Sequence, residues 1–332
     1  MGSEVPRKNC SSVIFFDYLY QQGPIDIAGT KRRAQLFFDV VIPLDCHGSG
    51  FAFLAEITGA AMSYPDSPRI HPTALISAEA ELAPDVQIGP YVVIQGEVKL
   101  GAGCVVKPFA HLLGRLTMGQ GNVIFSGAVL GEQPQHLKYE GEATGIEIGD
   151  NNIFRENVTI HRGTTQSWMT RIGSNNFFMA GSHVAHDCVV GNNCILANGA
   201  LLGGHCTVED SAYLSGNCAV HQFVRIGRLA LLSGSSATTK DIPPFIIQQN
   251  INNVVGVNVV GMRRAGMSTP EIEAVRQAFH TIFHDGMLLP AALAKVQQEL
   301  GAIASVAEMV AFIRQTKRGI NNASRDRLRT AA

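Results

Sequence analysis

Histidines gather in one part of the chain and offer a means of moving protons at neutral pH. The sequence contains eleven histidines. Four of them follow one another at short intervals, and a fifth precedes them: His161, then His183, His186, His205 and His221. Imidazole is the side chain best suited to proton transfer near pH 7. A single histidine is usually a solvated surface residue, so this chemistry requires a fold that brings several rings together.

The spacing of apolar residues indicates such a fold. Steps of six residues from Ile70 to Leu232 meet a large apolar residue at 25 of 28 positions. A helix repeats near every 3.6 residues and a strand every two, whereas a repeat of six is typical of a parallel β-helix built from short strands and turns. Three repeats close one coil of eighteen residues. His186 and His205 are nineteen residues apart, so their rings should lie on neighbouring coils.

The period is interrupted twice, each time by whole repeats. The steps at His136 and Glu142 are polar, and so is the step at Gln166. We interpret these as loops inserted into the β-helix, spanning 131–145 and 164–170. Loops carried on a rigid scaffold are common sites of binding residues. Glycine follows many of the apolar steps, and Gly, Asn or Asp often comes two or three residues later; these residue types tolerate the positive φ of tight corners.

Capping signals predict helices after the β-helix. Ser268-Thr269-Pro270-Glu271 should open a helix that ends near His284, a second should run near 290–300, and Ser305-Val306-Ala307-Glu308 should open a third that ends near Arg318. We therefore expect an irregular N-terminal extension (1–69), a β-helix domain (70–245) and a C-terminal linker with a helical domain (246–332). We expect Met62 to be the natural start, with the preceding residues an upstream mis-annotation; a lineage-specific extension is the alternative.

Composition excludes several classes of protein. The net charge is −1, which gives no reason to expect nucleic acid or an anionic membrane as partner. No apolar run approaches the roughly 20 residues of a transmembrane helix, and no signal peptide precedes the chain, so a cytoplasmic location is expected. Five of the seven cysteines share one step of the repeat and are interpreted as small buried residues: Cys104, Cys188, Cys194, Cys206 and Cys218.

A metal site is the main competitor to acid–base chemistry. Carbonic anhydrases on a similar β-helix use three histidines, two of them in an H-x4-H motif, which this sequence lacks. His183-x-x-His186 on a strand and turn would not obviously converge on one ion. We therefore predict no metal site. A β-helix that binds partners without catalysis stays a further alternative.

Seven segments, in order, resemble the UDP-N-acetylglucosamine O-acyltransferase family, which begins lipid A synthesis: HPTALI (71–76), QHLKYEGE (135–142), NVTIHRGT (157–164), HVAHDCVVGNNCILAN (183–198), AVHQF (219–223), DIPPF (241–245) and GVNVVGMRRAG (256–266). The resemblance covers about residues 65–320. It implies a left-handed β-helix that forms a homotrimer, with active sites between subunits. It also implies transfer of a (3R)-hydroxyacyl chain from acyl carrier protein to the sugar 3-OH, with no metal and no organic cofactor.

The resemblance assigns roles to residues of this sequence. His186 would be the general base, Asp187 would orient it, and the N–H of Gly204 would stabilise the oxyanion. Positions that would contact or support the sugar, nucleotide or acyl chain are Gln135, His136, Lys138, His161, His183, Asn198, His205, His221, Gln222, Asn258 and Arg264. Gly234 matches the position that limits acyl length, and glycine there implies a long chain.

Three residues depart from the family pattern. His136 stands where aspartate is common, which puts its sugar contact in doubt, and Val260 and Ala265 replace a common glutamate and a second arginine. The nearest alternative activity is that of the related N-acyltransferases, which act on an amino sugar. Those relatives normally carry an N-terminal uridine-binding domain, and residues 1–69 look too irregular for one.

Overall fold

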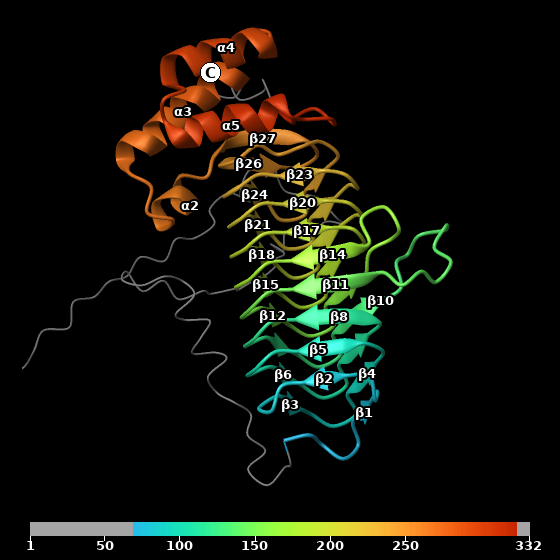
Figure 1. Cartoon of the computed structure of the whole chain (residues 1–332). Helices are drawn as coiled ribbons and strands as arrows, with labels where there is room; N and C mark the ends of the chain where they lie inside the picture. Colours follow the sequence, from blue (N-terminus) through green and yellow to red (C-terminus); the bar gives the residue numbers. More distant parts are fainter. Residues whose placement is uncertain (1–68, 324–332) are drawn as a thin grey trace, which may run out of the picture. The chain divides into compact units, whose positions relative to one another are not determined.

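The computed structural model describes residues 69–323, and the predictions for the N-terminal extension and for Met62 fall outside them. Within this range, short parallel strands stack into three sheets that form the faces of a left-handed β-helix (Figure 1). Four helices follow the last coils. The predicted fold class, a β-helix of six-residue repeats followed by a small helical domain, is confirmed.

Up to β25, each sheet takes every third strand of the chain, and β26, β27 and β28 then extend the third sheet. The first contains β1 (Leu75–Ile76), β4 (Val93–Gln95), β7 (His111–Leu113), β10 (Val129–Glu132), β13 (Thr159–His161), β16 (His183–Val184), β19 (Leu201–Leu202), β22 (Ala219–Val220) and β25 (Ala237–Thr238). The second contains β2 (Glu81–Leu82), β5 (Val98–Leu100), β8 (Arg115–Met118), β11 (Gly145–Ile148), β14 (Met169–Ile172), β17 (Val189–Val190), β20 (Thr207–Val208) and β23 (Arg225–Ile226). The third contains β3 (Gln87–Ile88), β6 (Val105–Val106), β9 (Val123–Ile124), β12 (Ile153–Phe154), β15 (Phe177–Phe178), β18 (Ile195–Leu196), β21 (Tyr213–Leu214), β24 (Leu231–Leu232), β26 (Ile246–Gln249), β27 (Asn253–Val257) and β28 (Asn322–Ala323).

The apolar residue of each six-residue step points into the β-helix. Leu112, Leu130 and Ile160 pair in register on the first face, and all three are fully buried. At roughly 2 kcal/mol for each buried aliphatic side chain, these inward-pointing residues make the main favourable contribution to the free energy of folding. Only the first coil departs: Ile70 remains 39% exposed, because no further coil of the described range covers that end.

Both predicted insertions are present. The first joins β10 to β11 and the second joins β13 to β14. The lengths of the insertions follow from the spacing of buried asparagines that stack in a column from coil to coil. Asn152 lies 30 residues after its neighbour Asn122 in the column, and Asn176 lies 24 residues after Asn152. The next step, to Cys194, returns to 18 residues. The side-chain oxygen of Asn152 accepts from the backbone N and Nδ2 of Asn176, and its own Nδ2 donates to Asn122 and to the carbonyl of Gly173.

The glycines that follow the apolar steps act differently from the prediction. Gly101 does not have a positive φ; a Cβ there would lie 2.6 Å from the carbonyl carbon of Gly119 on the next coil, so these glycines allow the coils to approach. The positive φ falls two residues later, at Gly103 (69°) and at Asn151 (55°). Asn and Gly therefore occupy the left-handed corner as expected.

The five cysteines of the repeat are buried thiols without a disulfide, as the small-residue interpretation predicted. Cys194 and Cys218 are fully buried. Burial raises the pKa of both thiols to about 12, so they remain protonated at physiological pH.

The β-helix continues past Pro244, where the six-residue count loses its phase. Strand β26 still pairs with β24, and β27 turns back antiparallel to β26. A short helix, α2 (Val259–Arg264), precedes α3 (Thr269–Phe283), α4 (Leu289–Leu300) and α5 (Ala304–Arg314). The hairpin and α2 were not predicted, and the predicted domain boundaries stay a prediction.

The structure has one of the two predicted helix caps and lacks the other. Ser268 caps α3 and accepts the N–H of Glu271, as expected. The capping box predicted at Ser305 is wrong: α5 begins at Ala304 after Ile303, and the Ser305 hydroxyl donates instead to Glu271 on α3. A tertiary contact therefore takes the hydroxyl that the sequence pattern assigned to a cap.

One ion pair and a hydrogen bond attach the helices to the last coils. Arg228 binds Glu308 of α5 through two nitrogens at 2.9 and 2.8 Å. Arg225 pairs with Asp241 at 3.2 Å and donates to the carbonyl of Phe312.

Across residues 69–323, no helix is both long and apolar enough to span a bilayer.

Candidate active site

Four of the predicted histidines lie close together on adjoining coils. His183 begins β16 and pairs in register with Thr159 of β13 and Leu201 of β19. Its Nδ1 lies 2.7 Å from the Thr159 hydroxyl. Its ring lies edge-on to that of His161, with 4.8 Å between the two ring centroids. His186 follows in the next turn, and its ring meets that of His205 edge-on at 5.1 Å. The expectation that neighbouring coils bring these rings together is confirmed.

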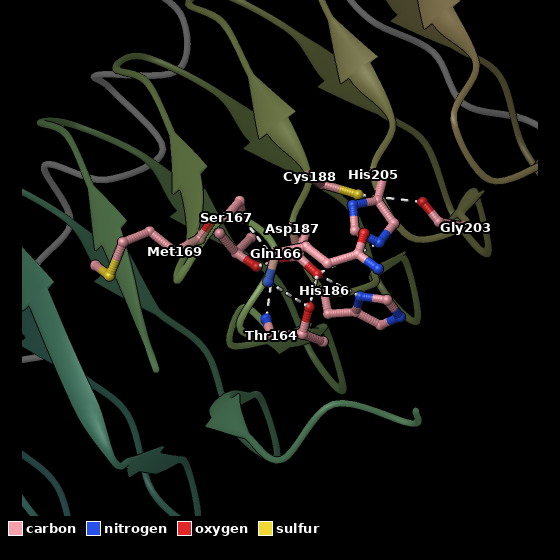
Figure 2. A network of polar contacts seen from close by, with 10 residues as sticks. Thr164, Gln166, Ser167, Met169, His186, Asp187, Cys188, Gly203 and His205 are labelled. Atoms are coloured by element: carbon pink, nitrogen blue, oxygen red, sulfur yellow. Dashed lines mark hydrogen bonds and ion pairs between the residues drawn. The ribbon is translucent and has the colours of Figure 1, made fainter. Parts of the chain in front are cut away.

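His186 and Asp187 form a buried pair (Figure 2). The Nδ1 of His186 lies 2.7 Å from Oδ2 of Asp187, which assigns the proton to Nδ1 and leaves Nε2 as the acceptor. Asp187 has a φ of 60° at the corner, and its side chain is wholly buried. Thr164 donates to it through both its backbone N and its hydroxyl, at 2.9 and 2.8 Å, and the Ser167 hydroxyl donates to Oδ1.

These donors keep Asp187 ionised. Burial alone would raise the pKa of the carboxyl, but the hydrogen bonds from His186, Ser167 and Thr164 outweigh burial and hold the pKa well below its usual range. A fixed negative charge therefore lies behind the His186 ring. Such a charge holds the ring in one tautomer and stabilises the imidazolium that forms when Nε2 takes up a proton.

The neighbouring rings are neutral. Burial, with a contribution from His183, lowers the pKa of the His161 ring to about 4. Burial also lowers the pKa of His183, against the opposing effect of its bond to Thr159, and lowers that of His205 against the attraction of Asp187. Neutral imidazoles can donate and accept hydrogen bonds without repelling a charge that develops on His186.

A groove of about 400 Å³ opens in front of the base. Its lining contains both polar and apolar residues: Gln135, His183, Ala185, His186, Leu201, Leu202, Gly203, Gly204, Ala219, Val220 and Gln222. A Cβ on Gly204 would lie 2.7 Å from Cε1 of His186, so only glycine fits there. Within residues 69–323 no acceptor takes the N–H of Gly204, which is therefore free to bind an anion at the groove.

The first insertion reaches the site from the side. The ring of His136 meets that of His186 edge-on at 5.2 Å, a contact that the sequence did not predict. Arg162 ties this loop to the second insertion by donating to the Tyr139 hydroxyl at 2.9 Å and to the Gly131 carbonyl at 3.2 Å. Gln135 lines the groove, whereas Lys138 is exposed on the loop and is not among the lining residues.

Other predicted positions do not meet the groove within a single chain. His221 is exposed, and its Nδ1 lies 3.3 Å from Arg318. Asn198, Gly234 and Arg264 lie outside the groove. Asn258 caps α2: its side chain accepts from Gly261 and donates to the carbonyl of Leu229, so both ends of the amide are engaged in folding. Roles for these residues in binding stay predictions.

One group of side chains in the described range has the spacing of metal ligands: His186, Asp187 and His205, with ligand atoms within 4.8 Å of one another. The carboxylate of Asp187 already accepts hydrogen bonds from three residues, and its side chain has no exposed surface. A metal ion would have to displace those donors. The donor set therefore fits a hydrogen-bonded catalytic pair better than a zinc site.

Sequence reasoning missed Thr164 and Ser167. Thr164 lay inside a recognised segment, and Ser167 had no pattern of its own because it belongs to an interruption of the repeat. The available signal was the position of the second insertion, on the coil just before that of Asp187.

A β-helix of six-residue repeats with a buried histidine–carboxylate pair beside a free backbone amide defines the class of hexapeptide-repeat acyltransferases. Family models agree: "bacterial transferase hexapeptide (six repeats)" matches residues 79–114 and 169–204, and "UDP N-acetylglucosamine O-acyltransferase; domain 2" matches residues 241–321. The acyl-(acyl-carrier-protein)–UDP-N-acetylglucosamine O-acyltransferase of Halorhodospira halophila is 48% identical over 76% of this chain and 98% of its own length.

Solved structures give the same result. The UDP-N-acetylglucosamine acyltransferase LpxA of Bacteroides fragilis superposes with a TM-score of 0.73 at 41% identity, covering 76% of this chain and 99% of the other. LpxA of Acinetobacter baumannii superposes with a TM-score of 0.74 at 38% identity, with the same coverage. The chain belongs to the acyl-(acyl-carrier-protein)–UDP-N-acetylglucosamine O-acyltransferase family.

Proposed function

We propose that this protein transfers a (3R)-3-hydroxyacyl chain from acyl carrier protein to the 3-OH of UDP-N-acetylglucosamine, the first step of lipid A biosynthesis, with His186 as general base. Membership of the family supports the reaction. The single observation that supports the base is the buried pair of His186 and Asp187, which leaves Nε2 of His186 as an acceptor beside the free N–H of Gly204.

The reaction follows from this geometry. Nε2 of His186 takes the proton of the sugar 3-OH as the oxygen attacks the thioester carbonyl. The carbonyl oxygen gains negative charge in the tetrahedral intermediate, and the N–H of Gly204 donates to it; one such donor is often worth about 3–4 kcal/mol. The intermediate then collapses, the carbon–sulfur bond breaks, and the carrier's thiolate receives the proton from His186.

The polar residues of the groove suit the sugar, and its apolar residues suit the acyl chain. Gln135, His183 and Gln222 offer polar atoms, and Leu201, which is 46% exposed, offers an apolar surface. The Nδ1 of His161 is buried without a partner within residues 69–323, which supports a hydrogen bond from it to a bound ligand. Lys138, His136 and His205 complete the proposed set around the sugar.

We further propose a homotrimer in the cytoplasm. Asn198, Gly234 and Arg264 fall outside the groove of one chain, which supports an active site completed by a neighbouring copy. Arg264, in the last turn of α2, would then meet the nucleotide phosphates. His221 and Asn258 would support the same site. Gly234 would leave room for a long acyl chain because it has no side chain to fill that space.

The test is a transfer assay with purified protein, hydroxyacyl carrier protein and UDP-N-acetylglucosamine in the presence of a chelator. His186→Ala should lower kcat by a factor of about 10³ or more while the protein stays folded. His111→Ala is the matched control, because His111 is exposed on β7, away from the groove, and full activity is expected.

A fully active His186→Ala variant would exclude this residue as the base. Stoichiometric zinc, found by elemental analysis of the purified protein, would favour the carbonic anhydrase alternative. Donors of several chain lengths, tested against both the sugar and its 3-amino analogue, separate the O-acyltransferase from the related N-acyltransferase.

A further inference from the structure

The second insertion surrounds the carboxylate of Asp187. Three of the four close hydrogen bonds to this carboxylate come from the loop: the backbone N and the hydroxyl of Thr164, and the hydroxyl of Ser167 (Figure 2). The fourth comes from His186. His205 approaches Oδ2 only to 3.5 Å. The loop therefore leaves the carboxylate one direction in which to act, toward Nδ1 of His186.

The same segment also fixes the backbone of Asp187. The N–H of Asp187 donates to the Thr170 hydroxyl at 2.9 Å, where the chain leaves the loop and enters β14. Asp187 has a φ of 60°, a conformation that costs a residue with a Cβ some free energy unless its surroundings hold it. Contacts to both the backbone and the side chain therefore come from one short stretch of chain.

The loop is held in place without help from Asp187. The N–H of Trp168 donates to the carbonyl of Thr164 at 2.7 Å, which closes one turn, and the N–H of Gln166 donates to the Thr164 hydroxyl. Gly163 donates to the carbonyl of Gly145 on β11, and Gly145 donates back to the carbonyl of Trp168. The donors aimed at Asp187 are thus built into the scaffold rather than assembled around a ligand.

The two hydroxyls have little freedom to point elsewhere. Thr164 Oγ1 accepts from Gln166, so its single proton is left to donate to Asp187. Ser167 has two acceptors in reach, Oδ1 of Asp187 and the carbonyl of Met169 at 2.9 Å. The charged oxygen is the stronger acceptor, and the proton belongs with it.

We propose that Thr164 and Ser167 are positioning residues for the catalytic pair, and that the second insertion serves to hold Asp187 so that His186 keeps its proton on Nδ1. This inference rests on the proposed role of His186 as base. Neither residue lines the groove, so both act through Asp187 rather than on the substrate. A purely structural role would leave the pH dependence of the reaction unchanged, whereas a positioning role would alter it.

The test compares Ser167→Ala, which removes the hydroxyl, with Ser167→Thr, which keeps it. Ser167→Ala should lower kcat by about 10- to 100-fold, the effect of losing one hydrogen bond to a charged group, with KM for the sugar nucleotide unchanged. A carboxylate with one donor fewer holds the imidazolium more tightly, so the acid limb of kcat/KM should move to higher pH. Ser167→Thr should restore both values. Thr165→Ala is the matched control, because Thr165 is exposed in the same loop and its side chain makes no hydrogen bond among residues 69–323.

A second readout needs no substrate. The proton on Nδ1 of His186 should give a low-field NMR resonance, identified by its absence in His186→Gln. It should broaden or shift in Ser167→Ala and remain in Ser167→Thr. If that result is obtained while the wild-type protein transfers no acyl chain, the positioning role stands and the proposed function fails. A Ser167→Ala variant with wild-type kcat and pH profile, or an inactive one whose resonance is unchanged, would overturn the inference.

Discussion

Replacing Asp187 by asparagine should inactivate the protein by changing the tautomer of His186. The structure fixes the orientation of the new amide. Oδ1 of Asp187 faces the backbone N–H of Thr164 at 2.9 Å, and a backbone N–H can only donate. The asparagine must therefore place its oxygen there and its NH₂ group at the position of Oδ2, opposite Nδ1 of His186. Two donors would then face each other at a separation of 2.7 Å in the native pair.

The ring escapes this conflict by moving its proton to Nε2, the atom that must accept from the substrate. Keeping the active tautomer instead would cost one hydrogen bond to a charged group, about 1.5–3 kcal/mol, and would leave a buried donor unpaired, about 1–3 kcal/mol more. A total of about 3–5 kcal/mol corresponds to a loss of about 10²–10⁴ in kcat. Side-chain volume hardly changes, so the melting temperature should change far less than the activity.

The assay is kcat at saturating substrate, with the tautomer of His186 read from ¹⁵N chemical shifts in protein labelled at histidine. Asp210→Asn is the control, because Asp210 also accepts a backbone N–H, that of Asn192, at a corner of the β-helix but lies away from the groove. An Asp187→Asn variant within threefold of the wild-type kcat would refute the reasoning. So would an inactive, folded variant in which the proton remains on Nδ1.

Three further predictions concern the scaffold. Asn152→Ala should lower the free energy of unfolding by about 3–5 kcal/mol, because it leaves buried backbone partners unpaired. Cys194→Ala, in the same column, should lower it by only about 1 kcal/mol. Equal losses for the two variants in urea titrations would contradict this. The pKa of His161 is about 4 in the folded state and near 6.5 when unfolded. The free energy of unfolding should therefore decrease by about 3 kcal/mol as the pH drops from above 6.5 toward 4. His161→Gln should reduce this decrease in denaturation curves measured across the same pH range. Burial raises the pKa of Cys194 and Cys218 to about 12, so both thiols should resist iodoacetamide at pH 8 until the protein is unfolded. Labelling is measured by peptide mass spectrometry. Stoichiometric labelling of the native protein would be inconsistent with their burial.

Much of the fold could be predicted because the β-helix repeats a local rule. Each coil must bury one aliphatic residue per face, so the anchors from Ile88 to Leu232 can be counted without knowing any long-range contact. The count fails where a coil changes length without a whole repeat: Leu231 pairs with Ile247, and the strand after Pro244 went unseen. Capping was predicted well at Ser268, where the bond is local, and failed at Ser305, where Glu271 of another helix competes.

The candidate site divides in the same way. The sequence by itself determined that His183, His186 and His205 lie on neighbouring coils, because the eighteen-residue coil converts spacing along the chain into distance across it. Only the tertiary structure decided which donors surround Asp187 and that His136 meets the base from a loop. Insertions have no period, so the place where their side chains arrive depends on hydrogen bonds between segments far apart in the sequence, and no spacing rule encodes those bonds.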